Sequence, residues 1–388
     1  MPVPSCWNDM PDNAVLLHVG PRKTGTTALQ SAFANARGDL KRLGISYPGH
    51  DLNQRGRIRK MLRGGEFSVG AGGQWPGRVV LSDETCDYLT FAAARTIAER
   101  IGRQRLAVLI TARPMARQLP SVWQQKVKRG NTDTTLADWL TDSLSGPSQP
   151  LWWRVDRMAD TWRTLLGPDR VFVLLLDEED HQALFRDVER LLDLPPDLLH
   201  PSMSNRGLTL EETEAVRQLN LSDSRAIHGT AALDDGVNRL VETRVPHESE
   251  RRPKLPGWAR SQVWTLQQTI VEGLRSQPNV IGDLDSWATR RDSDFTDDEQ
   301  DVVDLRQGPR LVPSEAVTLL ASPEPALVAS PAAGGQDLAS VPASALLSEL
   351  WSRLVGRLIP GRSNRAKAEP GRALGPAQIT AGAEVSDG

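Results

Sequence analysis

The sequence contains little cysteine, no long apolar run and no large excess of charge of either sign. Its two cysteines, Cys6 and Cys86, have no metal-ligand spacing to each other or to a histidine, which predicts free thiols in a reducing compartment rather than a disulfide framework. No apolar run approaches the roughly 18 residues of a membrane span. The first 13 residues lack the apolar stretch of a signal peptide. We therefore expect a cytoplasmic protein without a transmembrane segment.

The charge balance excludes a further class of protein. A net charge of −3 argues against a nucleic-acid-binding protein, which would normally be strongly basic. The hydrophobic content of 39% and the charged content of 24% are typical of a globular protein with a sizeable core. A chain of 388 residues has room for one large α/β domain or for two smaller ones.

The first half of the chain alternates between apolar runs and amphipathic stretches. The apolar runs, which predict strands, are Ala14–Val19, Arg78–Leu81, Leu106–Thr111 and Arg170–Leu176. Helical spacing of apolar residues predicts helices over Thr27–Arg37, Leu184–Leu194, Leu208–Leu221 and Gln262–Leu274. Gly38 is a plausible stop for the first helix. Strands that are apolar on both faces and alternate with helices predict an α/β fold of three layers, with a central parallel sheet flanked by helices.

The composition also suggests a division of the chain into an N-terminal extension (1–13), a folded domain (14–291) and a tail (292–388). The tail opens with an acidic stretch and continues with a segment rich in Ala, Pro, Ser and Gly, for which disorder is the expectation. A possible amphipathic helix over 343–359 could dock on the core, pair two chains into a homodimer or rest on a membrane surface. A glycine-rich stretch over 64–77 is expected to be a mobile loop, either a rim of the substrate cleft or a connector.

The most informative segment is the turn from Gly20 to Thr27, which reads Gly-Pro-Arg-Lys-Thr-Gly-Thr-Thr between a strand and a helix. Backbone amides in such a turn converge on one point and the helix dipole adds positive potential, so the turn can hold a phosphate-like anion. A Walker loop would place its lysine directly after the second glycine, where this chain has Thr26. Lys23 instead precedes Gly25 by two residues, which suits a transferred group less charged than a γ-phosphate, such as a sulfuryl group.

A second anion site is predicted after the strand that ends at Thr111. Arg113 and Ser121 stand eight residues apart across the turn into a helix, with Pro114 and Pro120 restricting the backbone. A guanidinium can grip a phosphate with two hydrogen bonds while a hydroxyl donates from another side.

Together the two segments resemble the sulfotransferase family, and in particular its bacterial members. The resemblance rests on the pattern from His18 to Gln30 and on four shorter stretches, which begin at Ser121, Gly167, Asn205 and Val280, and it covers roughly residues 14–290. It implies 3′-phosphoadenosine 5′-phosphosulfate as sulfuryl donor and no metal ion. It also implies an acceptor hydroxyl or amine on a carbohydrate, a glycolipid or a small metabolite.

The resemblance also assigns roles to individual residues. Lys23 would bind the sulfuryl group and the bridging oxygen, and Arg113 and Ser121 would bind the 3′-phosphate. The residues expected around the 5′-phosphate are Thr24, Gly25, Thr26 and Thr27, with Arg22 as a neighbour. Family members close a basic loop over the nucleotide, and Arg251, Arg252 and Lys254 occupy the corresponding place, although a solvated charge cluster is an equal alternative.

Transfer to a hydroxyl also needs a base for its proton. Glu84 follows the strand at Arg78–Leu81 and is our first candidate, the alternative being a carboxylate in the first turn of a helix. His50 is the reserve candidate. We expect His18, which lies inside a strand, to be a core residue, and the tryptophans at 123, 152 and 153 to be core residues rather than stacking platforms.

Two other functions remain open on the sequence alone. A kinase or phosphotransferase with a Walker-type loop is disfavoured by the position of Lys23 and by the absence of a clear magnesium carboxylate. A catalytically silent nucleotide-binding module is disfavoured by the complete set of Lys23, Arg113 and Ser121.

Overall fold

The computed structural model describes residues 7, 9–66, 77–84, 90–145, 153–201, 206–221, 230–246 and 250–297. The predicted amphipathic helix at 343–359, the acidic tail beyond residue 297 and most of the glycine-rich stretch lie outside the described residues. Within the described ranges no helix is long and apolar enough to cross a membrane.

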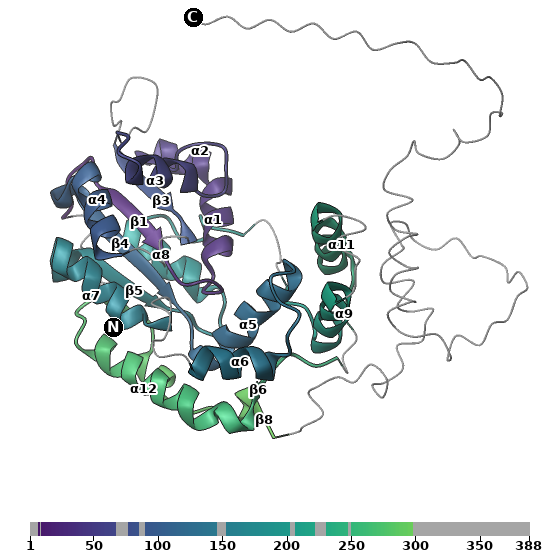
Figure 1. Cartoon of the computed structure of the whole chain (residues 1–388). Helices are drawn as coiled ribbons and strands as arrows, with labels where there is room; N and C mark the ends of the chain where they lie inside the picture. Colours follow the sequence, from purple (N-terminus) through teal and green to yellow (C-terminus); the bar gives the residue numbers. More distant parts are fainter. Residues whose placement is uncertain are drawn as a thin grey trace, which may run out of the picture.

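A six-stranded sheet forms the centre of the molecule, in the order β2-β3-β1-β4-β5-β7 (Figure 1). The strands are β1 (Val15–Val19), β2 (Ile45–Ser46), β3 (Arg78–Ser82), β4 (Leu106–Ala112), β5 (Val171–Leu175) and β7 (Val280–Ile281). All neighbouring strands are parallel. The predicted parallel sheet is therefore confirmed, as are its four longest strands. The two short edge strands, β2 and β7, were not predicted.

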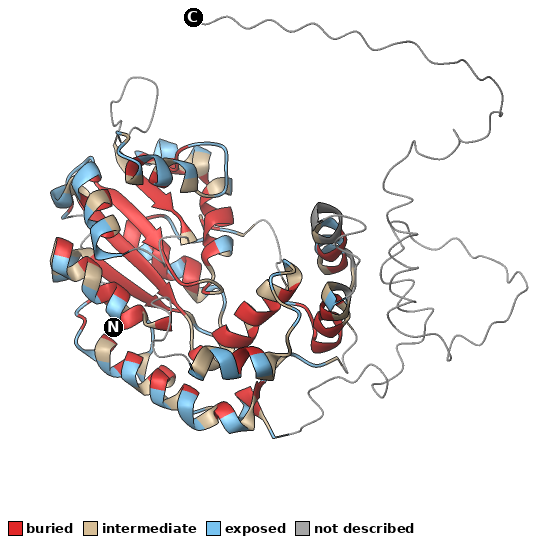
Figure 2. Cartoon of the chain, in the orientation of Figure 1, coloured by how far each residue is buried: buried red, intermediate tan, exposed pale blue. Residues whose placement is uncertain are grey.

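Helices cover both faces of this sheet, as the three-layer prediction requires. One face packs on α1 (Thr26–Asn35), α2 (Arg37–Arg42) and α8 (Ala183–Leu192). The other packs on α3 (Arg55–Leu62), α4 (Phe91–Ile101), α5 (Met115–Lys128), α7 (Val155–Leu166) and α12 (Arg260–Arg275). Leu16 belongs to the first apolar cluster and Leu17 to the second, because successive strand side chains point to opposite faces. Both are fully buried, and Figure 2 shows the central strands as a buried layer.

The remaining helices extend the molecule beyond the sheet. They are α6 (Leu136–Ser145), α9 (Leu210–Leu221), α11 (Thr230–Thr243) and the short α13 (Leu284–Ala288). Figure 1 shows α11 above α9, and Arg244, just after the end of α11, donates to Glu212 near the start of α9. The helix α9 packs against α5. A second, two-stranded sheet joins β6 (Leu255–Pro256) to β8 (Phe295–Thr296) in parallel.

One prediction of local structure needs correction. Gly38 does not end a helix: it lies inside α2 in open space, and the break between α1 and α2 falls at Ala36. Near the two ends of the described ranges, Trp7 and Met10 are buried in the cluster beneath α1 and Phe295 is buried in the opposite cluster. The division of the chain into 1–13, 14–291 and 292–388 stays a prediction.

Candidate functional site

The candidate site lies beyond the carboxyl end of β1, where the order of strands reverses. The strands β2 and β3 lie on one side of β1, and β4, β5 and β7 lie on the other. In open parallel sheets the loops diverge at such a switch point and leave a crevice for a ligand. The turn from Gly20 to Thr27 leaves β1 at this point and opens α1.

The shape of the turn explains its glycines. A Cβ at Gly20 would lie 2.4 Å from the Thr111 hydroxyl and 2.9 Å from the Thr111 carbonyl oxygen, so only glycine allows the turn to approach β4 this closely. Lys23 and Gly25 have φ angles of 68° and 78°, in the left-handed region. Gly25 is the residue preceding the first turn of α1, and its conformation leaves the first amides of the helix open to a ligand.

One threonine of the turn has a structural role that the sequence did not reveal. The Thr24 hydroxyl donates to the Pro21 carbonyl oxygen at 2.6 Å and lies 2.9 Å from the Thr111 hydroxyl. Since a hydroxyl has one proton to donate, Thr24 is left with its backbone amide for a ligand. Thr26 is buried beside it, whereas Thr27 is exposed.

His18 braces the strands beneath the turn. Its Nδ1 lies 2.8 Å from the Ser82 hydroxyl on β3 and its Nε2 lies 3.3 Å from the Thr111 hydroxyl on β4. Burial lowers the pKa of His18 to about 3, so the ring is neutral near pH 7. The prediction of a core histidine is confirmed. Trp123 and Trp153 are likewise buried core residues.

The ammonium group of Lys23 has a pKa well below the ordinary value for lysine. Its pKa is lowered to about 8, chiefly by burial and then by the positive charge of Lys128, with smaller effects of Arg129 and Arg113. The charge of Glu84 acts in the opposite direction and raises the pKa. Lys23, Arg113 and Glu84, which were predicted separately from three strand ends, therefore lie close enough to interact.

Arg113 and Ser121 form the pair that the sequence predicted. Nη1 of Arg113 donates to the Ser121 hydroxyl at 3.1 Å, and that hydroxyl donates to the Arg117 carbonyl oxygen. The same helix, α5, is joined to the glycine turn, since Gln118 donates to the Arg22 carbonyl oxygen at 2.9 Å. The two candidate anion sites are thus fixed to one another.

Glu178 is a member of the site that sequence reasoning missed. It follows β5 and accepts hydrogen bonds from Nε and Nη2 of Arg113 at 2.6 and 2.8 Å. Burial alone would raise the pKa of Glu178, but the hydrogen bonds and charge of Arg113 hold the pKa below its ordinary value. Its place after a parallel strand, at the same sheet edge as the turn, was the signal that could have identified it.

Glu84 lies beside an arginine at the end of β3. Its carboxylate is 3.5 Å from Nη2 of Arg55, whose Nε donates to the buried Asp83 at 3.4 Å. The helix that follows, α4, is capped by the Thr90 hydroxyl. His50 is exposed, and no contact in the described ranges joins it to the glycine turn.

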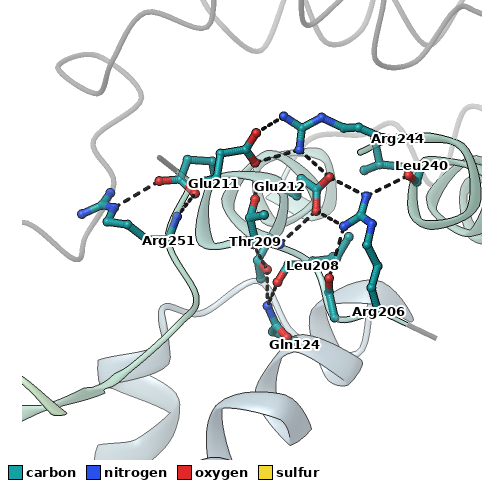
Figure 3. A network of polar contacts seen from close by, with 12 residues as sticks. Gln124, Arg206, Leu208, Thr209, Glu211, Glu212, Leu240, Arg244 and Arg251 are labelled. Carbon is teal, nitrogen blue, oxygen red and sulfur yellow. Dashed lines mark hydrogen bonds and ion pairs between the residues drawn. The ribbon is translucent and has the colours of Figure 1, made fainter. Parts of the chain in front are cut away.

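Within the basic segment 250–254, Arg251 contacts the start of α9. The Arg251 amide and Nε both donate to Glu211 at the start of α9, at 3.2 and 3.1 Å (Figure 3). Arg252 and Lys254 are exposed. The predicted contact of these three residues with a nucleotide stays a prediction.

The same figure shows how α9 is fixed to α5. Glu212 accepts two hydrogen bonds from Arg206, at 2.7 and 2.9 Å, and one from Arg244 at 2.6 Å. Gln124 of α5 donates to the Leu208 carbonyl oxygen at 2.6 Å (Figure 3). The helix that carries Ser121 is therefore braced on both sides, by the glycine turn and by α9.

A cavity of about 280 Å³ adjoins the Arg113 pair. It is bounded by the start of α5, the end of β5, α8, α12 and α13, and its lining includes Glu178, Arg117, Asp294, Trp264 and Trp287. Nε of Arg117 lies 2.7 Å from the Asp294 carboxylate. Burial raises the pKa of Asp294, although Arg117 and Arg291 act against this shift. In the part of the chain that the structure describes, no group of three or more His, Cys, Asp or Glu side chains could hold a metal ion.

Comparisons with known proteins give one weak similarity. No protein-family model matches the chain, and no curated protein matches it. Among solved structures, the chain is similar to the crystal structure of a sulfotransferase from Alicyclobacillus acidocaldarius, with 16% sequence identity and a TM-score of 0.35. The match covers 55% of this chain and 94% of that chain. A similarity of this size assigns neither a family nor a substrate.

Proposed function

We propose that this protein is a sulfotransferase that moves a sulfuryl group from 3′-phosphoadenosine 5′-phosphosulfate to a hydroxyl or amine. The observation that carries the proposal is the pairing of two cationic sites at the same edge of the sheet. Lys23 lies in the turn after β1 and the Arg113–Ser121 pair lies after β4, and α5 is hydrogen-bonded to both segments. A donor with a 5′-phosphosulfate and a 3′-phosphate has charge at two such points.

The glycine turn suits the 5′ end of this donor. Gly20 lets the turn pack closely against Thr111 of β4, and the open amides at the start of α1 suit the 5′-phosphate. With a pKa of about 8, Lys23 is mostly protonated at pH 7. It would hold the sulfuryl group and the bridging oxygen.

The Arg113–Ser121 pair suits the 3′ end. Glu178 engages Nε and Nη2 of Arg113 and so fixes the plane of the guanidinium, whose Nη1 points to Ser121. A 3′-phosphate would bind at this Nη1 and at the Ser121 hydroxyl, whose proton would turn from the Arg117 carbonyl oxygen to the phosphate. The cavity that shares Glu178 offers tryptophan surfaces and carboxylate acceptors to an adenine base.

The chemical step is an in-line displacement at sulfur. The acceptor oxygen forms a bond to sulfur as the bond from sulfur to the 5′-phosphate oxygen breaks, and 3′,5′-diphosphoadenosine leaves. Lys23 neutralises the charge that develops on the leaving oxygen. Glu84 takes the acceptor proton, and Arg55, 3.5 Å away, holds its carboxylate.

A radiolabelled donor tests this function. The wild-type protein, incubated with donor and an extract of the source cells, should transfer labelled sulfate to a discrete product, and Lys23→Ala should abolish the transfer. A protein that instead binds ATP only with magnesium would be a phosphotransferase. A protein that binds 3′,5′-diphosphoadenosine but labels no product in any extract would be a silent nucleotide-binding module.

A further inference from the structure

Three adjacent strands each end with a polar residue on the face of the sheet that packs against α1. These residues are His18 of β1, Ser82 of β3 and Thr111 of β4, and all three are fully buried. The residues two positions earlier on the same strands are apolar and belong to the cluster beneath α1: Leu16, Val80 and Leu109. Because an unpaired polar group is costly in such a place, the three side chains must bond to one another or to their neighbours.

Thr24 sets the direction of these hydrogen bonds on the side of the glycine turn. Its hydroxyl proton goes to the Pro21 carbonyl oxygen, 2.6 Å away. In its contact with the Thr111 hydroxyl, at 2.9 Å, Thr24 therefore accepts and Thr111 donates. Thr111 then has no proton left for His18, so Nε2 of His18 donates to Thr111 at 3.3 Å.

The other ring nitrogen of His18 sets the direction on the side of β3. A neutral imidazole carries one proton, so a proton on Nε2 makes Nδ1 an acceptor. The Ser82 hydroxyl therefore donates to Nδ1 at 2.8 Å. The oxygen of Ser82 in turn accepts from the amide of Gln30, a buried residue of α1, at 3.0 Å. Every group in this chain of hydrogen bonds thus has one defined role.

The chain reaches the glycine turn from both sides. It begins at Gln30 in α1, the helix that the turn opens, and crosses β3, β1 and β4 before it ends at Pro21 inside the turn. The amides of residues 22–27 lie between its two ends. They are the predicted contacts of a phosphate, and they are held by bonds that do not involve a ligand.

His18 also holds the end of β3, from which Glu84 leaves. The Asp83 amide donates to the His18 carbonyl oxygen at 3.1 Å. The Ser82 amide donates to Oε1 of Gln54 at 2.6 Å, and the Gln54 amide donates to the Ser82 carbonyl oxygen at 3.0 Å. The backbone that leads to Glu84 is therefore fixed relative to β1.

We infer that His18 is a positioning residue which, as the tautomer protonated on Nε2, fixes the glycine turn and the strand end of Glu84 relative to each other across β1. The bonds on the Thr111 side act on the turn and hence on donor binding. The bond to Ser82 acts on the end of β3 and hence on proton transfer to Glu84. These two effects rest on the proposed function, whereas the tautomer does not.

The tautomer can be measured on the wild-type protein without a ligand. Proton–nitrogen correlation spectra of nitrogen-labelled protein distinguish the protonated from the unprotonated nitrogen of each histidine ring. We expect His18 to carry its proton on Nε2 alone and to show no titration between about pH 5 and 8, since burial lowers the pKa of His18 to about 3. A proton on Nδ1, or a ring that titrates in this range, would overturn the inference.

Two variants cut the chain on opposite sides of His18. Thr111→Val should weaken the binding of 3′,5′-diphosphoadenosine about fivefold or more, with a smaller effect on the transfer rate at saturating donor. Ser82→Ala should lower that transfer rate about fivefold or more and leave the affinity for the nucleotide within about twofold. Thr111→Ser keeps the hydroxyl and should restore the affinity of the wild type. Calorimetric titration measures the affinity, and the radiolabelled donor measures the rate.

Thr213→Val is the matched control for the loss of a buried hydroxyl. Thr213 is fully buried on α9, where its hydroxyl donates to the Thr209 carbonyl oxygen at 2.6 Å and accepts from Gln124 at 2.8 Å. This variant should lose stability in urea much as Thr111→Val does. Its affinity for 3′,5′-diphosphoadenosine should nevertheless stay within about twofold of the wild type.

The variants separate a positioning role from a merely structural one. Equal losses of affinity in Thr111→Val, Ser82→Ala and Thr213→Val, or an unchanged affinity in Thr111→Val, would overturn the inference while the proposed function stands. If the wild-type protein neither binds 3′,5′-diphosphoadenosine nor transfers label, the proposed function fails and the two effects fall with it. The spectra still decide the tautomer in that case.

Discussion

Arg113 donates hydrogen bonds from Nε and Nη2 to both carboxylate oxygens of Glu178, while its Nη1 donates to Ser121. Both side chains of the ion pair are largely buried, with 21% and 11% of their surface exposed. The pair combines a structural ion pair with a candidate phosphate site in one guanidinium. The contribution of the Arg113–Glu178 ion pair to the free energy of unfolding can therefore be measured separately from the role of Arg113 in binding a phosphate.

A double-mutant cycle on Arg113 and Glu178 should give a coupling energy of about 1–3 kcal/mol in the free energy of unfolding. Either single alanine variant leaves a mostly buried charge without its partner, whereas the double variant removes both charges. Urea unfolding of the four proteins measures the coupling. The exposed pair of Arg103 and Glu99, 3.1 Å apart, serves as a control and should couple by about 0.5 kcal/mol or less. Equal coupling in the two cycles would contradict the structural role of Glu178.

Lys23→Met should raise stability at pH 7 by about 1–3 kcal/mol while it abolishes transfer. Burial and neighbouring cations lower the pKa of Lys23 to about 8 from 10.5, so its charged form is disfavoured in the folded state. Lys23 binds its proton more weakly when folded, so its unfavourable contribution should shrink as the pH rises from about 8 to 10.5. Urea unfolding of wild type and variant across this range measures the difference, which should narrow with rising pH. Lys41→Met, at an exposed position of α2, should show no such trend.

Gly20→Ala should destabilise the fold by about 1–3 kcal/mol, because the new Cβ would lie 2.4 Å from the Thr111 hydroxyl. Gly38→Ala makes the same chemical change inside α2, in open space, and should stabilise the protein by about 0.5–1 kcal/mol. Thermal unfolding of both variants checks that Gly20→Ala lowers the stability and that Gly38→Ala raises it. A neutral Gly20→Ala would show that the turn does not need its close approach to β4.

Glu84→Gln should lower kcat by about a hundredfold or more if this carboxylate takes the acceptor proton. Its affinity for 3′,5′-diphosphoadenosine should change little, because the predicted phosphate contacts lie on other residues. His50→Gln should retain wild-type kcat, since the ring is exposed and the described contacts do not join it to the turn. Steady-state kinetics measures both variants. If His50→Gln lowers kcat and Glu84→Gln does not, His50 is the base.

The sequence allowed the sheet and the main cationic residues to be predicted, for reasons that are visible in particular elements. Strands such as β4 are buried on both faces and leave continuous apolar runs, and Lys23 belongs to a turn with a recognisable chemical pattern. The strands β2 and β7 have two residues each, too few for a pattern. Glu178 lies in an acidic segment that reads as solvated loop, and its partner is 65 positions away. Contacts over such a distance are fixed by topology rather than by local sequence.

The central claim is that one crevice binds a nucleotide through two separate anion sites. Calorimetric titration with 3′,5′-diphosphoadenosine and with adenosine 5′-phosphate, in buffer containing a metal chelator, tests it most directly. We predict that the diphosphate binds at least about tenfold more tightly, and that Arg113→Ala removes most of this preference. Equal affinity for the two nucleotides, or binding of ATP that requires magnesium, would contradict the account.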